Sequence, residues 1–209
     1  MAKKELGLLG LLVAVGAITG ILNPRFLSAV NLLDMANLIG LFGIFSIGEG
    51  IVIITGGIDL SVGSMFAFLG VIFIDLLTNH GVPWPAAILL TVCAGIVLGV
   101  VQGLLVTRAK LQPFVVTLCG LLIYRGAARY YTEDSTMGFG YGDDYDWVGW
   151  LASGRSWGIP HSFILLIVVA LVMWVVLHRS VFGRYLFAIG KNEEAARFSG
   201  IHTNAVVAG

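Results

Sequence analysis

The chain has 209 residues, of which 58% are hydrophobic and only 11% are charged, and its mean hydropathy is +0.95. Soluble domains usually carry about 25% charged residues, so an ordinary soluble domain is excluded. The 12 basic residues balance the 12 acidic ones, which excludes a nucleic-acid-binding module built on a basic surface. The composition therefore predicts an all-α, polytopic transmembrane helical bundle that contacts membrane lipid and no nucleic acid, and its 28 glycines suit close helix packing.

Six apolar segments approach the length of about 20 residues that a membrane-spanning helix needs. In chain order they are residues 6–22, 35–54, 62–77, 85–106, 113–131 and 161–177. Lys3 and Lys4 precede the first segment, so a signal peptide is an alternative there. Its run of 17 apolar residues exceeds the usual h-region of about 7–15, which favours an uncleaved span.

The positions of lysine and arginine predict a cytoplasmic N-terminus, because cytoplasmic loops are enriched in these residues. This orientation puts eight of them inside and two outside. The inside set is Lys3, Lys4, Arg108, Lys110, Arg179, Arg184, Lys191 and Arg197, and the outside set is Arg25 and Arg155. Residues 132–160 then form an external loop, and residues 178–204 form a cytoplasmic loop.

The predicted external loop, 132–160, combines acidic and aromatic residues. Its charged residues are Glu133, Asp134, Asp143, Asp144 and Asp146 against Arg155 alone, and its tryptophans are Trp147, Trp150 and Trp157. Tryptophan is typical of membrane–water interfaces, which favours an interfacial loop with aromatic anchors. A docking surface for an external partner is the alternative.

Signatures of catalysis are missing. No GxxxxGK[ST] loop for ATP and no GxSxG nucleophile turn occurs, and the four histidines lack the spacing of a helical metal site. We therefore expect a chain that is not an enzyme and binds no cofactor or metal itself.

Glu49 lies well inside the second predicted span, where a carboxyl group costs roughly 3 kcal/mol on insertion scales. Such a residue tends to face a cavity or a partner, so Glu49 is a candidate for lining a translocation path. It could equally be protonated, or hydrogen-bonded between helices.

The segment that joins the second and third spans reads TGGIDLSVGS, residues 55–64. Gly56 and Gly57 permit a tight turn. Asp59 or Ser61 can cap the third helix by accepting its free N–H groups, and Gly63 follows in the same motif.

A short helix is predicted near the end of the chain. Asn192 is a good N-cap, negative charge at Glu193 and Glu194 suits the first turn, Ala195 and Ala196 favour helix, and Gly200 can end it. A helix of about two turns is marginal alone in water, so it needs packing against its own domain or another protein.

Two motifs make the chain resemble the permease subunits of bacterial ABC-type sugar importers, in the branch of ribose, xylose, galactose and autoinducer permeases. They are GGIDLSVGS, residues 56–64, and FGRYLFAIGKNEEAARFSGI, residues 182–201. The stretch LQPFVVTL, residues 111–118, with Arg125-Gly126 after it, is similar as well. The resemblance runs from about residue 31 to residue 201.

The resemblance implies an alternating-access permease of the bacterial inner membrane that works as a dimer with a second permease subunit. ATP and Mg would bind in separate ABC ATPase subunits, and a periplasmic sugar-binding protein would deliver a monosaccharide. The ATPase-coupling helix of such permeases corresponds to residues 192–200, with Asn192, Glu193, Glu194, Ala195, Ala196 and Gly200 as its motif positions.

Two features depart from that family. Glu49 stands where an apolar residue is usual, and the chain stops where family members continue with further spans, so residues 1–209 are expected to be one partial permease domain. The alternatives are an ATP-independent secondary transporter or channel, in which Glu49 would be an ion site, and a truncated remnant that does not transport.

Overall fold

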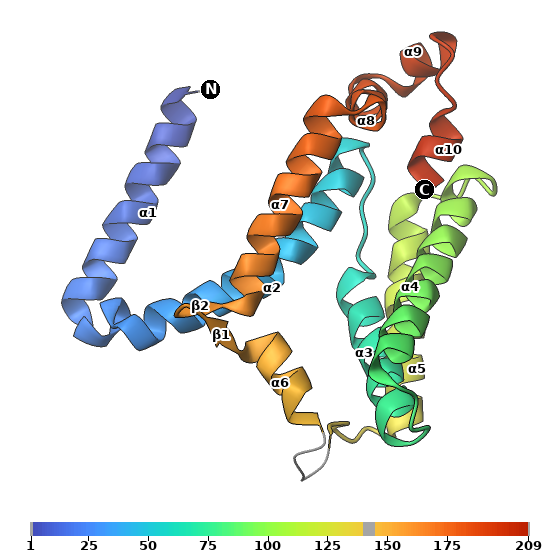
Figure 1. Ribbon diagram of the computed structural model, residues 1–209. Helices are drawn as coiled ribbons and strands as arrows, with labels where there is room; N and C mark the ends of the chain where they lie inside the picture. Colours follow the sequence, from blue (N-terminus) through green and yellow to red (C-terminus); the bar gives the residue numbers. More distant parts are fainter. Residues whose placement is uncertain (1, 140–144, 209) are drawn as a thin grey trace. The chain divides into compact units, whose positions relative to one another are not determined.

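The computed structural model describes residues 2–139 and 145–208, and this part of the chain is almost entirely helical (Figure 1). The prediction of an all-α chain is confirmed. The helices are α1 (Ala2–Leu22), the 3-10 helix η1 (Pro24–Leu27), α2 (Ala29–Ile54), α3 (Val62–Thr78), α4 (Trp84–Thr107), α5 (Pro113–Thr132), α6 (Asp146–Ser153), α7 (His161–Arg179), α8 (Val181–Lys191), α9 (Glu193–Phe198) and α10 (Thr203–Ala208). A two-stranded antiparallel hairpin, β1 (Arg155–Ser156) and β2 (Ile159–Pro160), precedes α7.

All six predicted spans are helices. By length and composition α2, α4 and α7 can each cross a membrane, and α3 and the Leu6–Leu22 part of α1 are shorter apolar helices. Helix α5 is long enough but less apolar, because it carries Arg125 and Arg129. Helix α2 begins six residues before the predicted position 35, since the Ser28 hydroxyl accepts the Asn31 N–H and starts the helix in a polar stretch.

The chain divides into two compact units. The first comprises Met1–Gly43 and Trp147–Val168, and the second Ile44–Asp146 and Val169–Gly209. In the first unit, α2 packs on the start of α7. The Ser162 hydroxyl donates to the Asn37 side-chain oxygen at 2.5 Å, and the bare Gly40 lets the α7 backbone come close.

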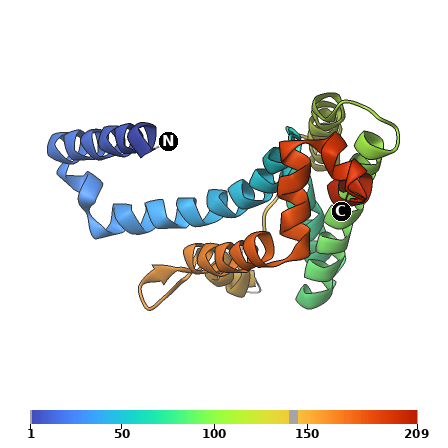
Figure 2. The same ribbon diagram turned by 90° about the horizontal axis from the view of Figure 1, so that it is seen from above.

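In the second unit, α3 lies against α4 and α5, and α10 packs on α4 and α8. The C-terminal helices are red in Figure 2, beside the green α4. Few side chains are fully buried, and most apolar side chains on these helices are exposed. Such surfaces would be costly in water but match the acyl chains of a bilayer.

The two predicted loops contain more structure than expected. Residues 132–160 hold α6 and the hairpin, whose two central residues, Trp157 and Gly158, have positive φ angles of 52° and 79°. This geometry defines a type I′ turn, which usually carries Asn-Gly, so Trp157-Gly158 does not signal a hairpin. Residues 178–204 hold α8, which was not predicted, besides the predicted helix α9. Asp143 and Asp144 lie outside the described residues.

Candidate functional site

The turn between α2 and α3 is organised by Asp59. Its Oδ1 atom accepts the backbone N–H of Ser61 and the Ser61 hydroxyl, both at 2.7 Å. Ser61 is fully buried and occupies the N-cap position of α3, but its hydroxyl accepts no N–H of that helix. Of the two candidate caps, Asp59 or Ser61, the Ser61 side chain does not cap α3, because that hydroxyl is engaged by Asp59 and by α4. Asp59 accepts the N–H of Ser61, the N-cap residue itself.

Gln102 of α4 is the partner that reaches Ser61. Its Nε2 donates to the Ser61 Oγ at 3.0 Å, and Gln102 itself is buried. A hydroxyl has one proton to donate, and the shorter contact with a carboxylate oxygen takes it. Ser61 thus donates to Asp59 and accepts from Gln102, which links the turn to α4.

Helix α5 completes this arrangement. The Thr117 hydroxyl lies 3.2 Å from the Ile58 carbonyl oxygen and 2.9 Å from the carbonyl oxygen of Pro113 in its own helix. Gly120 faces the Gln102 amide so closely that an added Cβ would overlap it. We call Asp59, Ser61, Gln102 and Thr117 the polar junction, because they join the 55–61 turn to α3, α4 and α5.

Glu49 approaches the same turn from α2. Its carboxylate lies 3.4 Å from the backbone nitrogen of Asp59, whose N–H it accepts, and its side chain is half-buried. The structure thus gives Glu49 a partner within the chain. This matches the interpretation as a hydrogen-bonded carboxylate between elements, while a role in a translocation path stays a prediction.

The glycines of the motif differ in what they do. Gly56 has a φ of +81°, which confirms the tight turn, whereas Gly57 has no positive φ and packs under the Val52 side chain. Gly63 is exposed in the first turn of α3, and nothing lies near its Cα.

Helix α8 ties the last third of the chain to this turn. It is amphipathic and buries Leu186 and Ile189. At its end, Gly190 lies so close to the Ile54 carbonyl oxygen that any side chain would collide with it. Ile54 ends α2 directly before the turn, so α8 rests on the segment that carries the polar junction.

Helix α9 follows immediately and has the predicted caps. The Asn192 Oδ1 accepts the Ala195 N–H at 2.9 Å, and Gly200 adopts the left-handed conformation with a φ of +85°. Glu193 and Glu194 occupy the first turn. The prediction of a capped helix is confirmed, although α9 is only six residues long.

The burial of α9 shows how little of it packs on its own chain. Ala196 is its single buried residue, and Glu193, Glu194 and Ala195 are exposed. Phe198 is 85% exposed, so its ring makes little contact with the described part of the chain. Aromatic side chains are enriched at protein–protein interfaces, so an exposed helix that carries one is a candidate contact for another protein.

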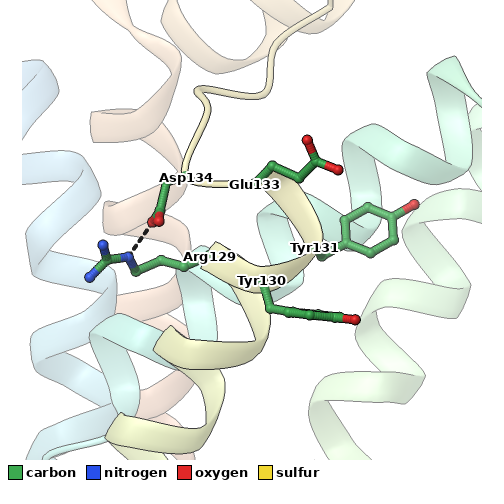
Figure 3. Close-up of a pocket in the computed structure, with 5 residues that line it drawn as sticks. All are labelled: Arg129, Tyr130, Tyr131, Glu133 and Asp134. Carbon is green, nitrogen blue, oxygen red and sulfur yellow. Dashed lines mark hydrogen bonds and ion pairs between the residues drawn. The ribbon is translucent and has the colours of Figure 1, made fainter.

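A hollow lies at the end of α5, bordered by Arg129, Tyr130, Tyr131, Glu133 and Asp134 (Figure 3). Arg129 turns to one side, where it donates to Asp134, and this hydrogen bond lowers the pKa of the Asp134 carboxyl. The other three side chains point away from that pair. Since they diverge, they do not form a binding site. Among the described residues, no three His, Cys, Asp or Glu side chains gather as a metal site.

Sequence reasoning missed Gln102 as a partner of the turn, and it missed Gly120 and Phe198 altogether. Gln102 carried a usable signal, since a polar side chain inside an otherwise apolar span tends to bond another element. Gly120 and Phe198 carried none, because their roles depend on which surfaces meet.

Comparison with known proteins gives one family match. The family model described as "Branched-chain amino acid transport system / permease component" matches residues 31–208. This range includes the polar junction and α9.

Curated relatives match nearly the whole chain. Ribose import permease protein RbsC of Escherichia coli (strain K12) is 35% identical over 206 residues, which are 97% of this chain and 63% of that protein. The protein of the same name from Bacillus subtilis (strain 168) is 38% identical over 95% of this chain and 60% of its own length. D-allose transport system permease protein AlsC of Escherichia coli (strain K12) is 33% identical over 91% of this chain and 58% of its own.

The chain thus spans about three fifths of the length of these relatives. No solved structure matches it.

Proposed function

The chain belongs to the family of permease components described for branched-chain amino acid transport, and from this premise we propose that it is the membrane-spanning permease part of an ABC importer. Its substrate is a monosaccharide, because the relatives that match it at 33–38% identity are named for ribose and D-allose. It lies in the bacterial inner membrane and pairs with a second permease subunit.

Energy for transport comes from separate ABC ATPase subunits. These subunits bind ATP and Mg, for which this chain has no binding motif. A periplasmic sugar-binding protein delivers the sugar. The single observation that carries the proposal is the state of α9. It is capped at both ends by its own residues, yet it buries only Ala196 and leaves Phe198 85% exposed.

The connections of α9 suit a mechanical role. It follows α8, whose Gly190 touches Ile54 at the base of the 55–61 turn, and it precedes α10, which packs on α4. The polar junction joins that same turn to α4 through Ser61 and Gln102. If an ATPase displaced α9, the movement would therefore reach the membrane helices in two ways, through α8 and through α10. Both contacts lead to the polar junction.

The alternative of a secondary transporter depended on Glu49 as an ion site. Its carboxylate has a backbone partner at Asp59, and that role needs no ion. The alternative would also leave the exposed α9 without a purpose.

Phe198→Ala tests the proposal. Because the ring is exposed, the variant should fold normally, whereas loss of an aromatic anchor should weaken association with the ATPase about 10-fold, or about 1.4 kcal/mol. Leu111→Ala is the matched control, since Leu111 is a 47% exposed apolar residue on the same predicted side. The chain is captured from gently solubilised membranes and the bound ABC ATPase is quantified by mass spectrometry.

The expected result is that an ABC ATPase is recovered with the wild-type chain and with Leu111→Ala, and that much less of it is recovered with Phe198→Ala. Equal recovery of the ATPase with both variants would contradict the proposal that Phe198 of α9 contacts the ATPase. Recovery of no ATPase, under conditions that preserve a control importer, would contradict the importer itself.

A further inference from the structure

The 155–160 hairpin carries the most exposed aromatic side chain of the first unit. Trp157 stands at its tip and is 94% exposed. Its φ of +52° is one that bulky residues rarely adopt, and type I′ turns normally place Asn, Asp or Gly there. Neither packing nor turn preference within the chain accounts for a tryptophan at this position.

The hairpin is bonded to the elements that flank it. The His161 Nδ1 lies 2.9 Å from the Trp150 carbonyl oxygen, and the His161 Nε2 lies 2.7 Å from the Ser156 hydroxyl. A carbonyl only accepts, so Nδ1 carries the proton, and in neutral His161 the Nε2 accepts from Ser156. Arg155 also pairs with Asp34 of α2 at 3.1 Å. Trp157 therefore stands on a hairpin that is bonded to α2 and to the start of α7.

The position of the hairpin along the chain places it at a membrane boundary. Helix α7 begins at His161, immediately after β2 (Figure 1), and its 19 residues are apolar enough to cross a membrane. At 1.5 Å per residue they span about 28 Å, close to the hydrocarbon thickness of about 30 Å, so His161 lies at the edge of that layer.

The reach of the hairpin keeps its tip close to the headgroup layer. Three residues, Gly158, Ile159 and Pro160, separate Trp157 from α7, a reach of at most about 10 Å. The headgroup region on each side is about 5–7 Å thick, so a hairpin that leans over the surface keeps its tip inside that region. Trp150, whose ring packs against His161 at the base of the hairpin, is exposed, as are Leu151 and Ile159. Leu165 and Val168 are exposed apolar residues of the first turns of α7. These residues adjoin or belong to a helix that can cross a membrane, which identifies lipid as the occupant.

We propose that the 155–160 hairpin lies on the bilayer surface and that Trp157 inserts between lipid headgroups, fixing the depth at which α7 enters the membrane. The indole suits this place, because its ring is apolar and its N–H can bond to headgroups or water. The proposal concerns only this chain and lipid, so it does not depend on any ATPase or sugar.

Tryptophan fluorescence of the full chain in liposomes tests it. The contribution of Trp157 is the difference between the wild type and Trp157→Phe, and Trp174→Phe isolates a matched residue that is exposed in the interior of α7. Two lipids are compared, one brominated near the headgroups and one near the ends of the acyl chains. We expect the Trp157 signal to fall about twofold more with the shallow bromines, and the Trp174 signal to show the reverse order.

Emission from Trp157 that matches tryptophan in water and ignores both brominated lipids would overturn the proposal. A water-like signal that shifts only when a periplasmic binding protein is added would also overturn it, and would assign the hairpin to protein docking. Both variants change exposed rings, so folding is checked by their elution from a sizing column in detergent.

Discussion

The polar junction and helix α9 both use small polar side chains. The junction uses them to bond one helix to another, whereas α9 uses them within its own helix. In the junction, Ser61 is fully buried, and its hydroxyl meets Asp59 and Gln102 within one unit. In α9, the Asn192 cap bonds only its own helix, and Ala196 alone is buried. Both segments lie within residues 31–208, which match the permease family. Their burial separates a segment that is held by the fold from one that is left accessible to a partner.

This difference predicts separable defects. Changes in the junction should act on the stability of the membrane helices, because they leave buried polar groups without partners. Changes in α9 should act locally or on association, because little of the chain packs on it.

Gly120→Ala should give the largest effect on stability. The new Cβ would overlap the Gln102 amide, which is buried and cannot move away without leaving Ser61. Overpacking of this kind costs about 1–3 kcal/mol of unfolding free energy, measured by SDS titration of the detergent-solubilised chain. Gly126→Ala is the matched control in the same helix, since nothing lies within 4 Å of its Cβ position. Equal stability of the two variants would show that the junction is not closely packed.

The coupling between Ser61 and Gln102 should be smaller. A double-mutant cycle with Ser61→Ala and Gln102→Leu should give an interaction energy of about 0.6 kcal/mol and no more than about 1.7 kcal/mol, the average and the maximum found for hydrogen bonds between membrane helices. Thr91→Ala provides the control, because Thr91 bonds the Ala87 carbonyl oxygen of its own helix. Its effect should simply add to that of Ser61→Ala. Additivity in the Ser61–Gln102 pair as well would mean that their contact contributes nothing.

The sequence predicted the helices better than it predicted their contacts. Five of the six spans start within four residues of their expected positions, because long apolar runs leave few alternatives. The exception is α2, whose first turns contain Asn31 and Asp34 and so look like a polar loop. The hairpin was missed for a related reason, since Trp157 is not a residue that signals a turn.

The site was predictable where its chemistry is local. The caps of α9 followed from Asn192 and Gly200, which act within a few residues of themselves. The partner of Ser61 lies 41 positions away on α4, and the close approach of Gly190 to Ile54 joins segments still farther apart. Such pairings depend on how the helices pack against one another, and this packing cannot be read from a single sequence.

Asn192→Ala should have the smallest effect on overall stability and still a clear local one. Losing the cap costs a helix about 1 kcal/mol, which corresponds to about fivefold faster hydrogen exchange at the α9 amides, Ala195 above all. The unfolding free energy should stay unchanged, because α9 contributes only Ala196 to the buried set. Asn192→Asp is the control, since its carboxylate accepts the same N–H and should preserve protection. If Asn192→Ala instead lowered global stability as much as Gly120→Ala does, α9 would belong to the same cooperative unit as the junction. The exposed Phe198 would then need an explanation other than a partner that acts on a separately folded helix.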